Sequence, residues 1–198
     1  GFLWIGTGKG LSRYNGNQIV NFRKADGLAD DFITVSTSDN IGNLYFGHLN
    51  GDISIYTGFR FITLKTETSS KVTGLDYDED TGTVWGVCQN GKLFQIKSNQ
   101  ISLFSPKKTH EKIINCLKAV KGKLWIGSSE GLLWIIPGSN SISAEGSVEK
   151  LDYINVTSLY ERENKGSMWA STENNGIFNV ENENAQKLDL PGLDSLYI

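Results

Sequence analysis

The sequence predicts an all-β protein built from many short strands. Glycine is abundant, at 22 of 198 residues, whereas there are only 3 prolines. Aromatic residues make up 11% of the chain. Turn glycines that separate short runs of aromatic and β-branched residues are typical of strands joined by tight turns. No segment shows the sustained apolar spacing that an amphipathic helix requires.

Length and charge narrow the possible functions. The chain is long enough for one domain, or at most two small ones, with a sizeable core. Its 19 basic and 22 acidic residues give a formal charge of −3, which argues against a nucleic-acid groove because such grooves need clustered positive charge. No window approaches 18 consecutive apolar residues, so we expect no membrane-spanning segment. The sequence opens without an initiator Met or a signal-like start, and we expect it to be part of a longer chain.

A repeat of about forty residues organises the chain. Bulky aromatic residues recur at intervals of 41, 40, 40 and 44 residues, at Trp4, Tyr45, Trp85, Trp125 and Trp169. Six or seven residues after each of them comes a glycine, at Gly10, Gly51, Gly91, Gly131 and Gly176. The last four aromatics also follow a turn glycine, at Gly42, Gly82, Gly122 and Gly166. Coincident landmarks in five successive segments indicate a true structural repeat.

Each repeat divides into four short strands bounded by Gly, Asn, Asp or Ser. In the second repeat we predict strands at 32–38, 43–47, 51–56 and 60–64. In the third we predict strands at 72–78, 83–88, 92–96 and 100–104. Four antiparallel strands repeated about every forty residues are typical of a β-propeller blade. The predicted repeats lie near 1–31, 32–71, 72–112, 113–153 and 154–192.

Packing between blades explains the recurring aromatic residues. A four-stranded sheet buries both faces only when it is stacked between neighbours, so we expect all five landmark aromatics to lie between blades. The first repeat begins at its second strand, and residues 193–198 match the pattern of an innermost strand. That last strand could complete the first blade and close a five-bladed ring. Alternatively, the chain forms an arc of a larger propeller. The two cysteines, Cys88 and Cys116, lie in apolar runs and are expected in the core.

The first repeat contains the sharpest motif. It reads LWIGT at 3–7 and GLSRYNG at 10–16, followed by Asn21–Phe22 and Asp26–Gly27–Leu28. This closely resembles the two-component regulator propeller repeat, whose consensus is LWIGT..GL.RYDG..F..F...DGL, with Asn15 in place of the usual Asp. Residues 124–127 with Gly131 and Leu132 are a second good match, and the other three repeats are degenerate.

Proteins with this repeat resemble the periplasmic sensor regions of bacterial hybrid two-component systems. The resemblance implies a ligand-sensing module built from seven-bladed propellers, in a parent protein with a membrane helix and a cytoplasmic kinase. It implies a periplasmic location, an oligosaccharide or other small ligand, and a possible homodimer formed through the parent's extracytoplasmic region. We expect no cofactor, no metal and no nucleic-acid partner.

Ligand-binding residues are expected in the loops at one face of the propeller. There, the turns between second and third strands and the connections from outer to next inner strand surround the axis, held on a rigid scaffold. Their amides, carboxylates and cations suit sugar hydroxyls, or the acid and sulfate groups of an anionic sugar; the alternative is that these loops are simply solvated. The candidate ligand-binding residues are Lys9, His48, Asn50, Gln89, Asn90, Glu130, Glu173 and Asn174.

We expect no catalytic residue. The equivalent inner-strand positions Thr34, Thr73, Asn115, Thr157 and Asp194 include one carboxylate, whereas a glycosidase needs a pair. His48 and His110 have no third metal ligand at a recognisable spacing. The acidic turn 76–80 lacks the spacing of a calcium loop and is expected to be a solvated hairpin. The sequence thus predicts a non-catalytic sensor that recognises a carbohydrate, with a protein-interaction scaffold as the first alternative and a glycan-active enzyme as the second.

Overall fold

The computed structural model describes residues 1–139, 141–162 and 167–189, which form five antiparallel sheets in chain order. The first sheet has three strands: β1 (Leu3–Thr7), β2 (Gly10–Tyr14) and β3 (Ile19–Phe22). The second comprises β4 (Ile33–Ser38), β5 (Leu44–His48), β6 (Ile53–Tyr56) and β7 (Phe61–Leu64). The third comprises β8 (Val72–Asp78), β9 (Thr83–Cys88), β10 (Leu93–Lys97) and β11 (Gln100–Phe104).

The remaining two sheets repeat the same up-and-down order. The fourth comprises β12 (Ile114–Val120), β13 (Lys123–Ser128), β14 (Gly131–Pro137) and β15 (Ile142–Ser147). The fifth comprises β16 (Val156–Glu161), β17 (Met168–Thr172), β18 (Ile177–Glu181) and β19 (Asn184–Lys187). Single 3₁₀ turns at Lys24–Asp26 and Glu149–Leu151 lie in the connections between sheets. The strands predicted in the second and third repeats agree with β4–β7 and β8–β11 to within two residues.

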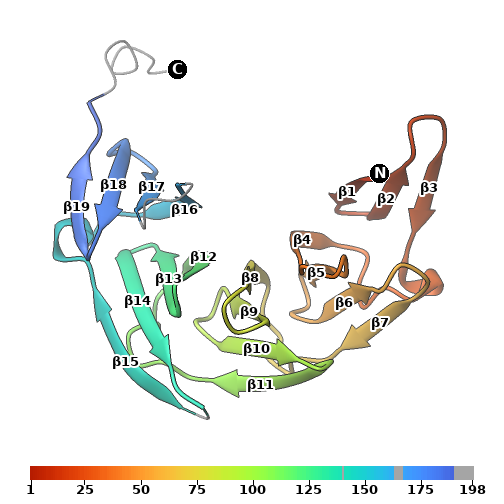
Figure 1. Ribbon diagram of the computed structural model, residues 1–198, viewed down its shortest axis with the longest axis horizontal. Coiled ribbons are helices and arrows are strands. Elements are labelled where there is room, and N and C mark those ends of the chain that lie inside the picture. The colour runs from red at the N-terminus through yellow and green to blue at the C-terminus, as the bar shows by residue number, and fades with distance from the viewer. Residues whose placement is uncertain (140, 163–166, 190–198) are drawn as a thin grey trace.

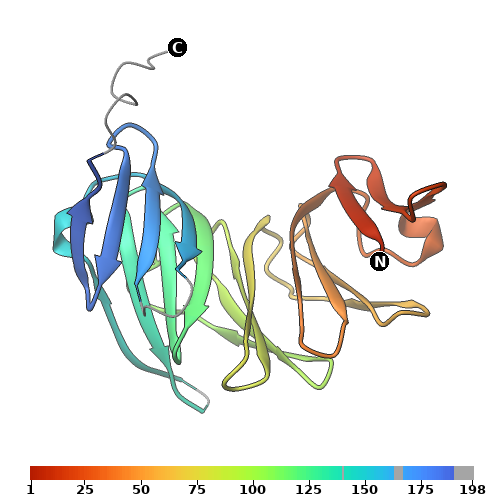
Figure 2. The ribbon, with the colours of Figure 1, turned by 45° about the horizontal axis from the view of Figure 1, so that its top comes forward.

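The sheets fan around an open axis (Figures 1 and 2). The inner strands β4, β8, β12 and β16 line the hollow, and β7, β11, β15 and β19 form the outer edge. Figure 1 shows an open arc of propeller-like sheets with the first and fifth sheets at its two ends. The alternative of a closed five-bladed ring is therefore not the form that the described residues take. The predicted inner strand at 193–198 lies outside the described residues.

The hydrophobic core lies between neighbouring sheets. Trp85 packs in a cluster with Leu117 and Ile126 of the next sheet. Tyr45 and Trp125 are buried in the corresponding way, and Trp4 is half-buried against Phe46. Trp169 departs from the prediction, because its side chain is 37% exposed on the outer face of the fifth sheet. No sheet beyond the fifth occurs within the described residues, so nothing there covers this face.

Both cysteines are free thiols, and Cys88 is buried while Cys116 is half-buried, in agreement with core positions. Burial raises the pKa of Cys116 to about 12, so its thiol stays protonated at neutral pH. None of the helical turns in the described part of the chain is long and apolar enough to cross a membrane.

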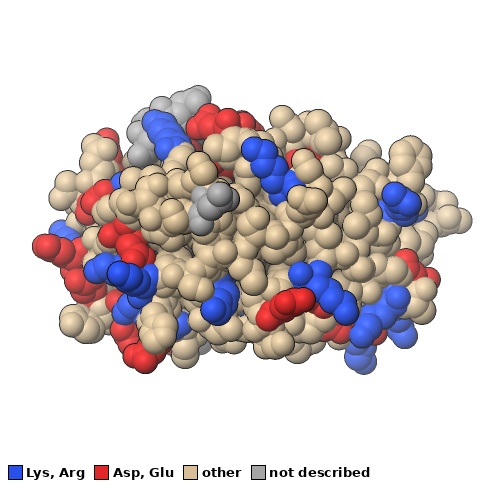
Figure 3. Space-filling view, turned by 90° about the horizontal axis from the view of Figure 1, so that it is seen from below, with Lys and Arg blue, Asp and Glu red and all other residues tan. Residues whose placement is uncertain are grey.

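The outer strands border a groove of about 440 Å³ between the third and fourth sheets. Its walls are residues 103–107, from the end of β11 onward, and residues 141–145 around β15. The backbone N–H groups of Lys107 and Lys108 donate to the Glu145 carboxylate at 3.2 and 3.1 Å, which ties the connection after β11 to β15. Figure 3 views the molecule from this side and shows cationic and acidic side chains interspersed around a broad uncharged area.

Candidate functional site

The predicted ligand-binding residues lie in the turns between the second and third strands of the five sheets. Because the strands of each sheet alternate in direction, all five turns emerge on the same side of the arc, which we call the loop face. Seven of the eight side chains belong to exposed residues there: Lys9, Asn50, Gln89, Asn90, Glu130, Glu173 and Asn174.

His48 is the exception. The sequence placed it in a loop, but it is the last residue of β5 and is completely buried. Its Nε2 lies 2.7 Å from the Ser54 hydroxyl oxygen, which also accepts a hydrogen bond from the Ala29 N–H at 2.9 Å. The imidazole is therefore part of the interior beneath the loops and cannot contact a ligand at the surface. The prediction that His48 is a ligand-binding residue is wrong.

Burial also determines the charge of His48. Removal from water lowers its pKa below the usual 6.5, outweighing the Asp30 carboxylate, the nearby Phe32 backbone and the carboxylates of Asp52 and Asp31, which act in the opposite direction. The Nδ1 atom makes no hydrogen bond of regular geometry within the described residues. A neutral imidazole buried in this way is a structural group that holds the connection before β4 against β6.

A repeated backbone hydrogen bond builds the rim of the axial hollow. The residue directly before each inner strand accepts through its carbonyl oxygen from an N–H of the second-to-third-strand turn of the same sheet. The four bonds, from 2.8 to 3.2 Å, are Leu49 N to Phe32 O, Gln89 N to Lys71 O, Ser129 N to Ile113 O and Glu173 N to Asn155 O. We call the acceptors, Phe32, Lys71, Ile113 and Asn155, the entrance residues.

The sequence analysis missed the entrance residues. They differ in chemistry from sheet to sheet, so no shared residue type marks them. The signal that could have identified them is positional, since each lies at the start of an inner strand: Phe32 is the first residue of the predicted strand 32–38, and Lys71 directly precedes the predicted strand 72–78. Their common backbone bond places them beside the predicted residues of the same loops, including Gln89 and Glu173.

Each inner strand carries a β-bulge just inside this rim. The pairing register shifts at Thr34, Thr73, Asn115 and Thr157, the same positions that the sequence marked as equivalent. Bulges re-aim a side chain and are frequent next to binding sites. Two of these side chains reach the next sheet: the Thr34 hydroxyl donates to Val72 O at 2.7 Å, and Asn115 Nδ2 donates to Val156 O at 2.8 Å.

Amide and carboxylate groups join the fourth and fifth sheets at the rim. Asn115 Nδ2 also donates to Asn155 Oδ1 at 2.8 Å, and Asn155 Nδ2 donates to Glu173 Oε2 at 2.8 Å. These hydrogen bonds connect Glu173, one of the predicted ligand-binding residues, with the side-chain amides of Asn155 and Asn115. The remaining carboxylate oxygen of Glu173 makes no hydrogen bond among the described residues and can accept one from a ligand.

The other predicted residues are partly engaged with their own turns or with the adjoining connections between sheets. Glu130 pairs with the Lys112 ammonium group. Asn50 bonds through both ends of its amide to Asp52, and Asn90 Nδ2 reaches Thr68 O at 3.4 Å. These contacts fix the side chains in place while leaving them exposed on the loop face. We observe no contact that brings all seven residues into a single cluster in the described residues; they follow the rim sheet by sheet.

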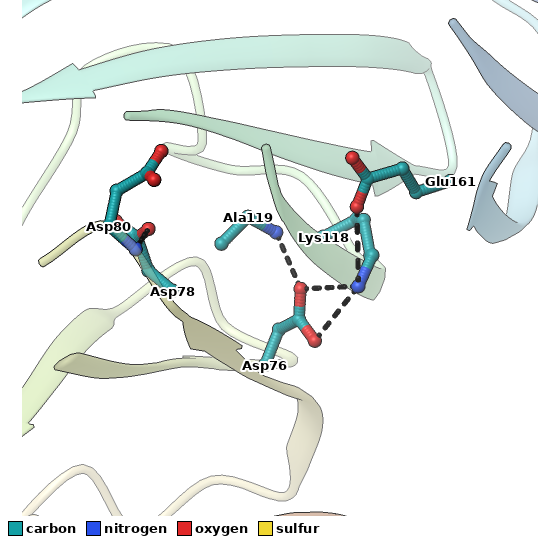
Figure 4. A network of polar contacts seen from close by, with 6 residues as sticks. All are labelled: Asp76, Asp78, Asp80, Lys118, Ala119 and Glu161. Carbon is teal, nitrogen blue, oxygen red and sulfur yellow. Dashed lines mark hydrogen bonds and ion pairs between the residues drawn. The ribbon is translucent and has the colours of Figure 1, made fainter. Parts of the chain in front are cut away.

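The opposite ends of the inner strands carry a charged network (Figure 4). Lys118 Nζ lies 2.9 Å from Asp76 Oδ2, and the same oxygen accepts a hydrogen bond from the Ala119 N–H at 2.8 Å. The Glu161 carboxylate oxygen Oε2 lies 4.0 Å from Lys118 Nζ. Lys118 and Glu161 border a cleft of about 270 Å³, which Asp78 and Asp80 also line. The expectation of a solvated acidic hairpin is therefore wrong for Asp76, and also for Asp78, which is buried and accepts from Thr81 at 2.8 Å.

The network limits what these acidic groups can do. Asp76 and Glu161 both lie beside the same ammonium group, so they form part of an ion-pair ladder between three sheets. Across residues 1–139, 141–162 and 167–189, no three His, Cys, Asp or Glu side chains converge as metal ligands would. The inner-strand carboxylates of Asp76 and Glu161 are thus tied into the scaffold.

Comparison with known proteins supports the fold. No family model matches the chain, and none of the curated proteins matches it significantly. Two crystal structures of the extracellular domain of BT4673 from B. thetaiotaomicron, described as a one-component system and as a hybrid two-component system, are similar to it. Their TM-scores are 0.74 and 0.71 and their identities 19% and 20%, and each match covers 96% of this chain.

A third similar structure is that of an enzyme. A catalytically inactive variant of virginiamycin B lyase from Staphylococcus aureus, with quinupristin, matches with a TM-score of 0.76 and 14% identity, over 96% of this chain and 68% of that one. At such identities the likeness shows the fold alone. The chain spans 27% of the BT4673 extracellular domains. A hybrid two-component system is also the kind of system whose propeller repeat the motif at residues 3–28 resembles.

Proposed function

We propose that the chain is a non-catalytic, ligand-sensing propeller segment of an extracytoplasmic sensor, and that its loop face recognises a carbohydrate. The observation that carries this proposal is the repeated rim, in which exposed amide and charged side chains stand beside inner-strand hydroxyls and amides in sheet after sheet. Such groups match the dense hydroxyls of a sugar, and rigid hairpins hold them in position. The similarity to extracellular domains supports a location outside the cytoplasm, which we propose to be the periplasm.

The state of the inner-strand carboxylates supports a non-catalytic role. A glycosidase needs two carboxyl groups that flank a substrate bond. In the described residues Asp76 forms an ion pair with Lys118 and accepts a hydrogen bond from a backbone N–H, and Glu161 lies beside the same lysine. The fold alone also hosts enzymes, as the lyase neighbour illustrates, so the argument rests on the site and not on the architecture.

The direct test is a glycan array followed by titration calorimetry on the 198-residue chain. We expect at least one oligosaccharide to bind and to be recovered intact. Binding should weaken in Glu173→Ala and Gln89→Ala, with unchanged unfolding curves. Cleavage of the bound oligosaccharide, or the absence of binding to any glycan, would overturn the proposal.

A protein-interaction scaffold is the second candidate, and the groove between β11 and β15 favours it. Leu103 is 48% exposed there, and the facing wall of the groove includes Ile142 and Ala144. A partner seated in this groove, including a second copy of the parent protein, would be displaced by Leu103→Asp. A carbohydrate on the loop face would not be affected by that substitution.

A further inference from the structure

The loop face includes an exposed aromatic ring that the sequence analysis did not select. Phe32 is the entrance residue of the second sheet, and 43% of it is exposed to solvent. Leu49, whose N–H bonds to the Phe32 carbonyl at 3.2 Å, is 46% exposed. Two neighbouring apolar side chains are thus exposed at rim positions where the third and fifth sheets carry polar residues, while the fourth sheet carries the exposed Ile113.

The ring of Phe32 lies against the first sheet. A methyl group added at Gly8 would come within 3.1 Å of the ring, so the ring packs directly on this glycine in the β1–β2 turn. The same turn contains Lys9, whose N–H bonds to the Thr7 hydroxyl at 3.0 Å. The β5–β6 turn is joined to Phe32 by the Leu49 N–H, and the next residue of that turn is Asn50, whose amide bonds to Asp52.

This arrangement brings an aromatic ring and two predicted ligand residues together from three separate segments. Contact with Gly8 restricts the motion of the ring, which reduces the entropy lost when a ligand stacks on it. Lys9 follows Gly8 and Asn50 follows Leu49, so the two segments that adjoin Phe32 each supply a hydrogen-bond donor. A flat apolar surface with polar groups at its edge is complementary to a pyranose ring, which has an apolar face of C–H groups and an equator of hydroxyls.

The charges around the ring discriminate between classes of sugar. The flanking loops contain three cations and four carboxylates, namely Lys9, Arg23 and Lys24 against Asp26, Asp30, Asp31 and Asp52. A sulfated or uronic-acid sugar needs an excess of positive charge to offset its desolvation, and this loop cluster does not provide one. A neutral sugar needs none.

We infer that Phe32, Lys9 and Asn50 form a binding subsite for a neutral pyranose, whose apolar face stacks on the Phe32 ring while its hydroxyls bond to Lys9 and Asn50. The inference rests on the proposed function and deepens it, because it names the class of sugar and the point of attachment. Glu173 and Asn155, at the other end of the rim, then contact further units of a longer oligosaccharide.

Calorimetry on the 198-residue chain with two sets of probes tests the inference. The neutral set is maltohexaose, xylohexaose and mannohexaose, and the anionic set is hexagalacturonate and a heparin hexasaccharide. We expect a neutral probe to bind, and Phe32→Ala to weaken that binding about tenfold because the stacking surface is lost. Phe32→Trp should retain binding. Phe32→Leu keeps the apolar contact with Gly8 and should also weaken binding, which covers the case in which the alanine variant is unstable.

Phe59 provides the matched control. Its ring is 97% exposed in the turn between β6 and β7, on the side of the arc opposite the loop face, and Phe59→Ala should bind as the unaltered chain does. Binding of anionic probes only, or neutral binding that is unchanged in Phe32→Ala and Phe32→Leu, would overturn this subsite and leave the proposed carbohydrate function intact. Failure of every glycan to bind would overturn both.

Discussion

The interfaces in the middle of the arc differ from the faces at its two ends, although the same repeat builds both. Trp85 and Trp125 lie between sheets and are only 4% and 8% exposed to solvent, whereas the equivalent Trp169 is 37% exposed. At the other end Leu3 and Ile5, on the outer face of the first sheet, are 58% and 42% exposed. Identical positions in a repeat therefore contribute unequally, because the stabilisation comes from the neighbouring sheet and not from the residue itself.

The largest expected difference lies between the two tryptophans. Trp85→Ala should lower the free energy of unfolding by about 3–5 kcal/mol, because it empties the space between the third and fourth sheets. Trp169→Ala should cost about 1 kcal/mol or less, since its ring contacts Tyr160 and Arg162 on an open face. Urea unfolding of both variants measures the difference. Equal losses would contradict the view that the neighbouring sheet determines the effect.

A smaller difference in the free energy of unfolding is expected between an ion pair in the middle of the arc and one at its end. Asp76→Asn removes the carboxylate that joins Lys118 and the Ala119 N–H between two inner strands, and should cost about 2 kcal/mol. Glu183→Gln removes the partner of Lys123 at the edge of the fifth sheet, where one side chain is 40% exposed, and should cost less than about 1 kcal/mol. Unfolding midpoints in low and high salt test this. The Glu183 pair should be the more sensitive to salt.

Protonation provides a third contrast, between a buried and an exposed histidine. Because burial lowers the pKa of His48 in the folded state, the unfolded chain takes up a proton first as the pH falls through about 6.5. Stability conferred by the neutral imidazole is complete above that pH. Below it, stability declines by at most about 1.4 kcal/mol per pH unit until His48 is protonated in the folded state as well.

Urea unfolding between pH 5 and pH 8 measures this decline in the unaltered chain and in His48→Gln. The dependence attributable to His48 should be missing from the variant. His110→Gln is the control, because the His110 side chain is 77% exposed in the connection between the third and fourth sheets. The same pH profile in His48→Gln as in the unaltered chain would show that the buried imidazole does not control stability.

The features that the sequence predicted well are those determined by local geometry. The turn glycines are an example. Gly91 has a φ of 84°, and a side-chain Cβ there would lie 2.4 Å from Thr109 O, so glycine marks the hairpin reliably. Strand positions follow from such turns. The spacing of the aromatics likewise indicated the stacked sheets, and the equivalent positions Thr34, Thr73, Asn115 and Thr157 proved to be bulges.

The features that the sequence did not predict depend on residues distant along the chain. His48 is polar and borders a turn, which is typical of a loop residue, but Ser54 and the Ala29 N–H accommodate it in the interior. Phe32 reads as the first apolar residue of an inner strand, yet its ring packs on Gly8 of the preceding sheet. The exposure of Trp169 depends on which sheets surround it. None of these contacts leaves a local pattern, because the partner segments are brought together only by the stacking of the sheets.

The smallest expected effect compares two equivalent bulge threonines. The Thr34 hydroxyl lies 2.7 Å from Val72 O of the next sheet and 3.0 Å from Gly47 O of its own sheet, whereas the Thr157 hydroxyl bonds only to Ser171 O of its own sheet, at 3.2 Å in an exposed position, among the described residues. Valine keeps the shape of threonine and removes only the hydroxyl. Thr34→Val should therefore cost about 1 kcal/mol, and Thr157→Val less than about 0.5 kcal/mol, because water can replace the bond at the exposed site. If the two substitutions have the same cost, the bonds between sheets add nothing to the apolar packing, and the inner strands are held in place by the core alone.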